Sequence, residues 1–112
     1  MTAFHIPMRL PSLANTRMHW RAMNKLKRSQ RIAVFYSMFN LELPPLPVIV
    51  TITRSGPRRL DDDNLQAACK YVRDQIAAAF GEDDGSAAYT WKYDQRKSKT
   101  YGVDVEIVKR LL

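Results

Sequence analysis

The sequence contains very little cysteine and no long apolar run. Cys69 is the single cysteine in 112 residues, which excludes an internal disulfide bond and any zinc site built from several cysteines. No stretch approaches the roughly 18 apolar residues that a membrane-spanning helix needs, and the chain does not open on a signal-peptide pattern. We therefore expect a cytoplasmic protein that does not associate with membranes.

Acidic residues are missing from the first third of the chain. Residues 1–41 contain seven basic residues and no Asp or Glu, whereas the remaining 71 residues hold 11 basic and 11 acidic ones. The net charge of +7 thus belongs entirely to the N-terminal segment. Such an excess is typical of nucleic-acid binding, although a solvated helix face in a basic protein would give the same composition. The candidate DNA contacts in this segment are Arg21, Lys25, Lys27 and Arg28.

The length and the hydrophobic pattern predict one α+β domain spanning residues 1–112. Apolar alternation and β-branched runs predict strands near residues 4–8, 48–53, 89–94 and 103–107. A helical stretch is expected near residues 15–39, as one long helix or two short ones, with Asn15 or Thr16 as the cap. With a second helix over residues 64–80, the order β-α-β-α-β-β predicts a mixed sheet of about four strands. The sheet is expected to end in a hairpin and to pack against two main helices.

Residues 64–80 carry the clearest helical pattern in the chain. Leu65, Cys69, Val72 and Ile76 lie at the spacing of one apolar face of an amphipathic helix, and Gly81 supplies a C-terminal stop. Because Cys69 falls on this apolar face, we expect its side chain to be buried in the core.

Two short acidic runs stand out in this basic protein. The runs Asp61–Asp63 and Asp83–Asp84 hold five of the eleven acidic residues. Adjacent carboxylates repel one another unless a cation neutralises them, and Mg²⁺ is held by such oxygens together with substrate phosphates. Arg58 and Arg59 precede the first run, separated from it only by Leu60, and they suit a phosphate. Metal-dependent chemistry on a phosphate backbone is therefore the leading hypothesis.

The candidate metal ligands are Asp61, Asp63 and Asp84. Asp61 and Asp63 project to the same side if the chain there stays extended. A helix of about 17 residues, about 25 Å long, separates them from Asp84, which must either return along the helix or come from a second subunit. A purely structural interpretation also exists, because Asp63 with Gln66 fits a capping box and the second run fits a turn.

At these residues the chain resembles the RusA family of Holliday junction endonucleases, which are common in phages and prophages. Residues 61–65 match the family pattern Asp-x-Asp-Asn-Leu at a helix start, and residues 81–84 match its helix exit followed by Asp-Asp. The resemblance implies a homodimeric RusA-like fold that nicks four-way DNA junctions. It further implies Mg²⁺ or Mn²⁺ held by Asp61, Asp63 and Asp84, without a small-molecule cofactor.

One position departs from the family pattern. The family has a catalytic Lys four residues after the second Asp, where this chain has Ala67. Lys70, one turn further along the predicted helix, is the candidate substitute that would stabilise charge on a phosphate; the alternative is a solvated surface lysine.

The sequence as a whole thus predicts a Mg-dependent endodeoxyribonuclease acting on branched DNA in recombination or repair. The resemblance places it in a bacterial host cell, with a phage or prophage origin. A non-catalytic DNA-binding protein of the same fold, or a small regulatory protein whose acidic motif only caps a helix, are the alternatives.

Overall fold

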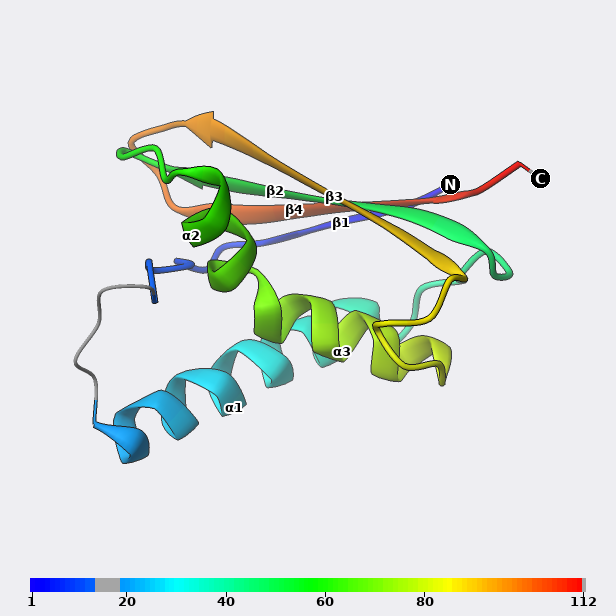
Figure 1. Cartoon of the computed structure of the whole chain (residues 1–112), viewed down its shortest axis with the longest axis horizontal. Coiled ribbons are helices and arrows are strands. Elements are labelled where there is room, and N and C mark those ends of the chain that lie inside the picture. Colours follow the sequence, from blue (N-terminus) through cyan, green and yellow to red (C-terminus); the bar gives the residue numbers. More distant parts are fainter. Residues whose placement is uncertain (14–18, 112) are drawn as a thin grey trace.

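The chain folds into two layers, a sheet and a set of helices. The computed structural model describes residues 1–13 and 19–111. Within these ranges it forms one four-stranded sheet and three helices, and the helices lie on one face of the sheet (Figure 1). This arrangement confirms the predicted α+β class with a four-stranded mixed sheet. The elements are β1 (Thr2–Ile6), α1 (Trp20–Met38), β2 (Val48–Gly56), α2 (Asp62–Ala68), α3 (Lys70–Phe80), β3 (Tyr89–Lys97) and β4 (Gly102–Lys109).

The strand order is β1-β4-β2-β3, so the predicted terminal hairpin is wrong. β4 pairs with β1 and β2 in antiparallel fashion, whereas β3 pairs only with β2, to which it is parallel. The side chains explain this order. Val103, Val105 and Ile107 of β4 are buried, as suits an inner strand, whereas β3 carries exposed Lys92 and Asp94, which protect a sheet edge from further pairing.

The parallel pair β2–β3 fixes where β3 begins. Val48 pairs with Tyr89 and Gly56 with Lys97, so β3 starts where β2 starts. The two ends of β2 are about 26 Å apart, from eight residue steps of about 3.3 Å each, and the first acidic run follows the far end. The second acidic run lies in the loop before β3, and this loop turns back along α3, because the Asp84 carbonyl oxygen accepts a hydrogen bond from Trp91 Nε1 at 2.9 Å.

The core lies between the sheet and the helices, and α1 contributes Val34 and Met38 to it. Val50 and Ile52 of β2 alternate inward and are fully buried, as are Val72 and Ile76 of α3. Cys69 is also fully buried, as expected, and burial raises the pKa of its thiol to about 12. The thiol is therefore neutral at physiological pH and serves as a small apolar group.

The predicted single helix over residues 64–80 is in fact two helices. Cys69 interrupts it with φ −88° and ψ −1°, and its N–H is shared between the carbonyl oxygens of Leu65 at 3.1 Å and Gln66 at 3.2 Å. The apolar spacing continues unchanged across this residue, because the apolar side chains of α2 and of α3 both face the core. The hydrophobic pattern alone therefore contains no sign of the break.

α1 is one continuous helix rather than two short ones. His19 caps its start, because its ring nitrogen accepts a hydrogen bond from the Arg21 N–H at 3.2 Å. The expected caps Asn15 and Thr16 lie outside the described residues. The buried side chains of α1 all belong to its C-terminal half and are Gln30, Val34 and Met38.

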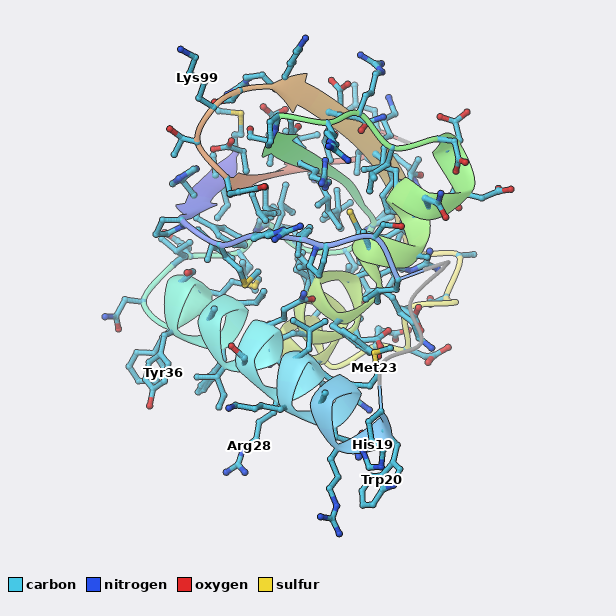
Figure 2. The ribbon with its side chains drawn as sticks, turned by 90° about the vertical axis from the view of Figure 1, so that its left-hand side faces the viewer. His19, Trp20, Met23, Arg28, Tyr36 and Lys99 are labelled. Atoms are coloured by element: carbon cyan, nitrogen blue, oxygen red, sulfur yellow. The ribbon has the colours of Figure 1, made fainter. Side chains whose placement is uncertain are left out.

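The N-terminal half of α1 is exposed. No side chain from Trp20 to Ser29 is buried, and in Figure 1 these turns extend beyond the start of α3. Figure 2 shows Trp20, Arg28 and Tyr36 pointing away from the body of the molecule. The exposed large apolar side chains of α1 and of the residue that follows it are Trp20, Ile32, Phe35, Tyr36 and Phe39. In the described ranges, no helix combines the length and the apolar character that a membrane crossing requires.

Two isoleucines on helices allow a matched test of this core. Ile76 is fully buried, whereas Ile32 on the outer side of α1 is 46% exposed. Ile76→Ala is expected to lower the free energy of unfolding by about 2–5 kcal/mol, and Ile32→Ala by less than about 1 kcal/mol. Urea unfolding followed by circular dichroism measures both. Equal losses for the two variants would contradict this assignment of the core.

Candidate carboxylate site and basic surfaces

Asp61 caps α2 and does not lie on an extended segment beside Asp63. Its Oδ1 accepts a hydrogen bond from the Asn64 N–H at 2.9 Å, and its Oδ2 accepts one from Asn64 Nδ2 at 3.1 Å. The capping box predicted for Asp63 is therefore wrong, because α2 begins at Asp62 and the cap is Asp61. The helix starts earlier than expected because Asp61 supplies the cap two residues ahead of Asp63.

Asp62 and Asp63 occupy the first turn of α2 and are exposed. Residues in a helix are rotated by about 100° from one to the next, so the alternation of an extended chain does not hold here. Carboxylates in a first turn are stabilised by the helix dipole, typically by 0.3–1 kcal/mol each. These side chains thus have a structural role, and they also present oxygen atoms to solvent.

The segment that leads into α2 is held by β3. The side-chain amide of Gln95 accepts a hydrogen bond from the Leu60 N–H at 2.9 Å and donates one to the Leu60 carbonyl oxygen at 2.7 Å. These two bonds fix the residue directly before Asp61. The position of the first acidic run is therefore set by the sheet and not only by the helix cap.

Asp84 is engaged by Arg73 of α3. Its Oδ2 lies 2.9 Å from Arg73 Nε, at an angle that leaves this buried nitrogen without a hydrogen bond, so the contact is ionic. The Asp84 carbonyl oxygen accepts hydrogen bonds from Arg73 Nη2 at 3.2 Å and from Trp91 Nε1 at 2.9 Å. The same guanidinium lies over the Trp91 ring, 4.9 Å from its centroid. Asp84 is thus tied to α3 and β3.

Tyr93 completes the surroundings of Arg73. Arg73 Nη1 donates a hydrogen bond to the Tyr93 hydroxyl at 2.8 Å. Burial by itself lowers the pKa of Arg73, but Tyr93 and Asp84 outweigh this effect and the pKa is raised. Burial raises the pKa of Tyr93, while the charge of Arg73 opposes the rise. Arg73 is therefore positively charged at physiological pH.

The fold does not bring Asp84 to Asp61 and Asp63 within one chain. Asp84 is held beside Arg73 of α3 and Trp91 of β3, whereas Asp61 and Asp63 lie at the start of α2. Among residues 1–13 and 19–111, no three His, Cys, Asp or Glu side chains come close enough together to hold a metal ion. Instead, Asp84 borders a recess of about 250 Å³ together with Asp74, Glu82, Asp83 and Arg31.

Lys70 is the first residue of α3, directly after the break at Cys69. Its side chain is exposed, and within the described residues no ion pair or hydrogen bond engages its ammonium group. Since the break at Cys69 separates it from α2, Lys70 does not lie one turn beyond Ala67 in the same helix, as the sequence led us to expect. The role of Lys70 stays a prediction.

α1 is a basic helix without acidic residues. Its Arg21, Lys25, Lys27 and Arg28 are all exposed, and like charges three or four residues apart each cost about 0.2–0.5 kcal/mol. Arg21 also lies in the first turn, where the helix dipole disfavours a cation. An anionic partner near these side chains would relieve both costs.

A second basic surface, formed at the end of β2, contains residues that the sequence reasoning missed. The exposed Arg58 and Arg59 line a recess of about 490 Å³ together with Arg9, Arg54 and Tyr101. Arg54 is 5% exposed and occupies an inward position of β2, in line with the apolar Val50 and Ile52. In the sequence, Arg54 continues the inward alternation of Val50 and Ile52, and a charged residue at such a position could have indicated its special role.

The Arg73 contacts can be tested through Tyr93. Arg73→Gln removes the positive charge that opposes the effect of burial, so the Tyr93 pKa is expected to rise further above its ordinary value of about 10. Because the folded-state pKa is raised, the stability that Tyr93 contributes is present below the unfolded-state pKa and is lost as the pH rises through the folded-state pKa. Carbon NMR of the Tyr93 ring during an alkaline titration measures the shift. Lys92→Gln, on the outer face of the same strand, is the control, and equal Tyr93 pKa values in all three proteins would contradict the contact.

No protein-family model and no curated protein sequence matches this chain. The likeness to the RusA family therefore rests on residues 58–85, and function has to be argued from the chemistry of the two acidic runs and the two basic surfaces.

Proposed function

We propose that this protein is a Mg²⁺-dependent endodeoxyribonuclease that hydrolyses phosphodiester bonds in four-way junctions and related branched DNA. The observation that carries the proposal is the closeness of two arginines and three carboxylates in residues 58–63, at the entry to α2. Arg58 and Arg59 suit phosphate groups, and Asp61 to Asp63 present hard oxygen ligands beside them. Recombination or repair in a bacterial host cell is the setting that the RusA-like motif favours.

The residues at the start of α2 fit Mg²⁺ better than they fit a metal ion that needs a complete set of protein ligands. Mg²⁺ keeps several waters and needs only one or two protein carboxylates when substrate phosphates complete its coordination. Asp61 and Asp63 would hold the ion, which when bound supplies an activated water and stabilises the leaving oxygen. Mn²⁺ fits the same oxygen donors. Lys70 would place a positive charge near the leaving group in the absence of a lysine at position 67.

Asp84 would join this site from a second copy of the chain. Within the described residues of one chain it is held by Arg73 of α3 and does not form a cluster with Asp61 and Asp63, whereas a two-fold dimer would bring the acidic loop of one copy beside the α2 start of the other. A dimer with two sites also matches the approximate two-fold symmetry of a four-way junction. The Arg73 contact leaves Oδ1 of Asp84 available to a ligand.

The basic helix α1 would hold DNA phosphates without reading sequence. Its exposed basic side chains, including Arg28 in Figure 2, point away from the core. A second candidate function, DNA binding without cleavage, is favoured by one observation. Ala67 stands where the family pattern has its catalytic lysine, so a chain that retained only the phosphate contacts would still bind junctions.

Nicking of a labelled four-way junction under single-turnover conditions, with and without Mg²⁺, tests the proposal. Asn caps a helix as well as Asp does, so Asp61→Asn keeps α2 intact while it removes a carboxylate charge. Asp61→Asn and Asp63→Asn are each expected to slow nicking by at least about 100-fold. Junction affinity should be unchanged or higher, because a negative charge near the phosphates is lost.

Asp62→Asn is the matched control for these variants. It removes the same charge between the two proposed ligands and is expected to leave the rate of nicking nearly unchanged. Parental rates for both Asp61→Asn and Asp63→Asn would exclude the metal role. A parent protein that binds the junction tightly but never nicks it would establish the binding function instead.

Mixing two inactive variants tests whether Asp84 acts across a dimer. In a mixed dimer of Asp63→Asn and Asp84→Asn chains, one composite site carries both substitutions and the other carries neither. Co-expression should therefore restore up to about a quarter of the sites, if chains pair at random. Restored nicking supports a site shared between two copies. If both variants are inactive alone and the mixture is also inactive, each site lies within a single chain.

A further inference from the structure

The recess at the end of β2 is lined by positively charged side chains, and no carboxylate lines it. Its volume is about 490 Å³, and its lining contains four arginines and no acidic residue: Arg9, Ser12, Arg54, Pro57, Arg58, Arg59, Leu60 and Tyr101. Within the described part of the chain, no Asp or Glu forms an ion pair with any of these arginines. Positive charges gathered in this way repel one another, so the recess favours an anion.

Arg54 forms the rigid floor of the recess. Its Nε donates a hydrogen bond to the Leu10 carbonyl oxygen at 2.8 Å, and its Nη1 donates one to the Arg58 carbonyl oxygen at 2.9 Å. These bonds join three separate segments of the chain at one guanidinium. Burial lowers the pKa of Arg54, and the nearby charge of Arg9 acts in the same direction. A bound anion would relieve both effects.

Arg9 is held in place by an aromatic ring. Its guanidinium carbon lies 5.0 Å from the centroid of the Tyr101 ring, which is within the range of a cation–π contact. The Tyr101 ring in turn lies close to Gly56, where an added Cβ would be 3.4 Å from the ring and from Arg54 Nη1. The side chains of the recess are therefore positioned by the fold before any ligand binds.

We propose that this recess is a binding site for one phosphate group of a nucleic-acid backbone, with Arg9 and Arg59 as its exposed ligands and Arg54 as its buried support. Arginine forks match the geometry of phosphate oxygens and bind them in bidentate fashion. The recess adjoins the start of α2 through residues 58–61, so its phosphate is a neighbour of the phosphate that the carboxylates would face. The inference deepens the proposed function, but phosphate binding itself does not depend on cleavage.

The first experiment uses inorganic phosphate in metal-free buffer with EDTA. Arginine side-chain N–H signals of the intact protein are followed by ¹⁵N NMR during the titration. Saturable shifts of the Arg9, Arg54 and Arg59 signals are expected, and Arg9→Gln and Arg59→Gln should each weaken the binding several-fold. Lys109→Gln removes one positive charge at the opposite end of the sheet, where Lys109 pairs with Val48, and should bind phosphate like the parent. Absence of saturable shifts in the parent would overturn the site.

The second experiment identifies the source of the phosphate. The affinity for a short DNA duplex is measured at several salt concentrations, again with EDTA. Each lost phosphate contact reduces the slope of log K against log salt by roughly 0.9, so Arg9→Gln and Arg59→Gln should have shallower slopes than the parent and Lys109→Gln. Since no metal is present, this result is independent of whether the protein nicks DNA.

Two other occupants give different results. If the recess takes only a free phosphate ion, the arginine signals shift but the salt slopes of all variants equal that of the parent. If it takes the acidic recess of a second copy, Arg9→Gln and Arg59→Gln change the concentration dependence of self-association in analytical ultracentrifugation and leave the DNA slope unchanged. Either result would overturn the assignment to a nucleic-acid phosphate.

Discussion

The in-register parallel pairing of β2 with β3 is the constraint on which the arrangement of charges depends. Because β3 starts beside the start of β2, the chain must travel back along the helices before it enters β3. The start of β3 then lies at one end of the sheet, and the segment between β2 and α2 lies at the other. The loop that carries Asp84 turns back along α3 and is held by Arg73 and Trp91, whereas the basic residues around Arg58 lie beyond the end of β2.

A single buried cation organises the basic end. Arg54 takes a core position in β2, and its hydrogen bonds reach the segment after β1 and the segment before α2. Arg73 has a similar structural role beside β3, because it contacts Asp84 and Tyr93 and lies over the Trp91 ring. Each of the two guanidinium groups therefore connects separate segments of the chain.

α1 presents two kinds of exposed side chain to solvent, basic ones and large apolar ones. Its N-terminal half carries basic side chains with no acidic neighbour in the helix, and its outer side continues into exposed Phe35 and Tyr36. Gln30, on the inner side of the helix, is buried, and its side chain has no hydrogen-bond partner among the described residues. The first turns of α1 contribute no buried side chain to the core.

Patterns that are local in the sequence were enough to determine the α+β class, the four strands, the burial of Cys69 and the basic character of α1, because alternation, helical spacing and charge counts need no knowledge of distant residues. Only the tertiary structure decided the strand order, the break at Cys69, the cap at Asp61 and the engagement of Asp84 by Arg73. Strand order depends on which strands are flanked on both sides by other strands. The break at Cys69 leaves no sign in the sequence, because the apolar spacing continues unchanged through it. The recess around Arg54 is made by residues 9, 54, 58, 59 and 101, which lie far apart in the chain. Their meeting depends on pairing within the sheet, and so it was decided by the tertiary structure alone.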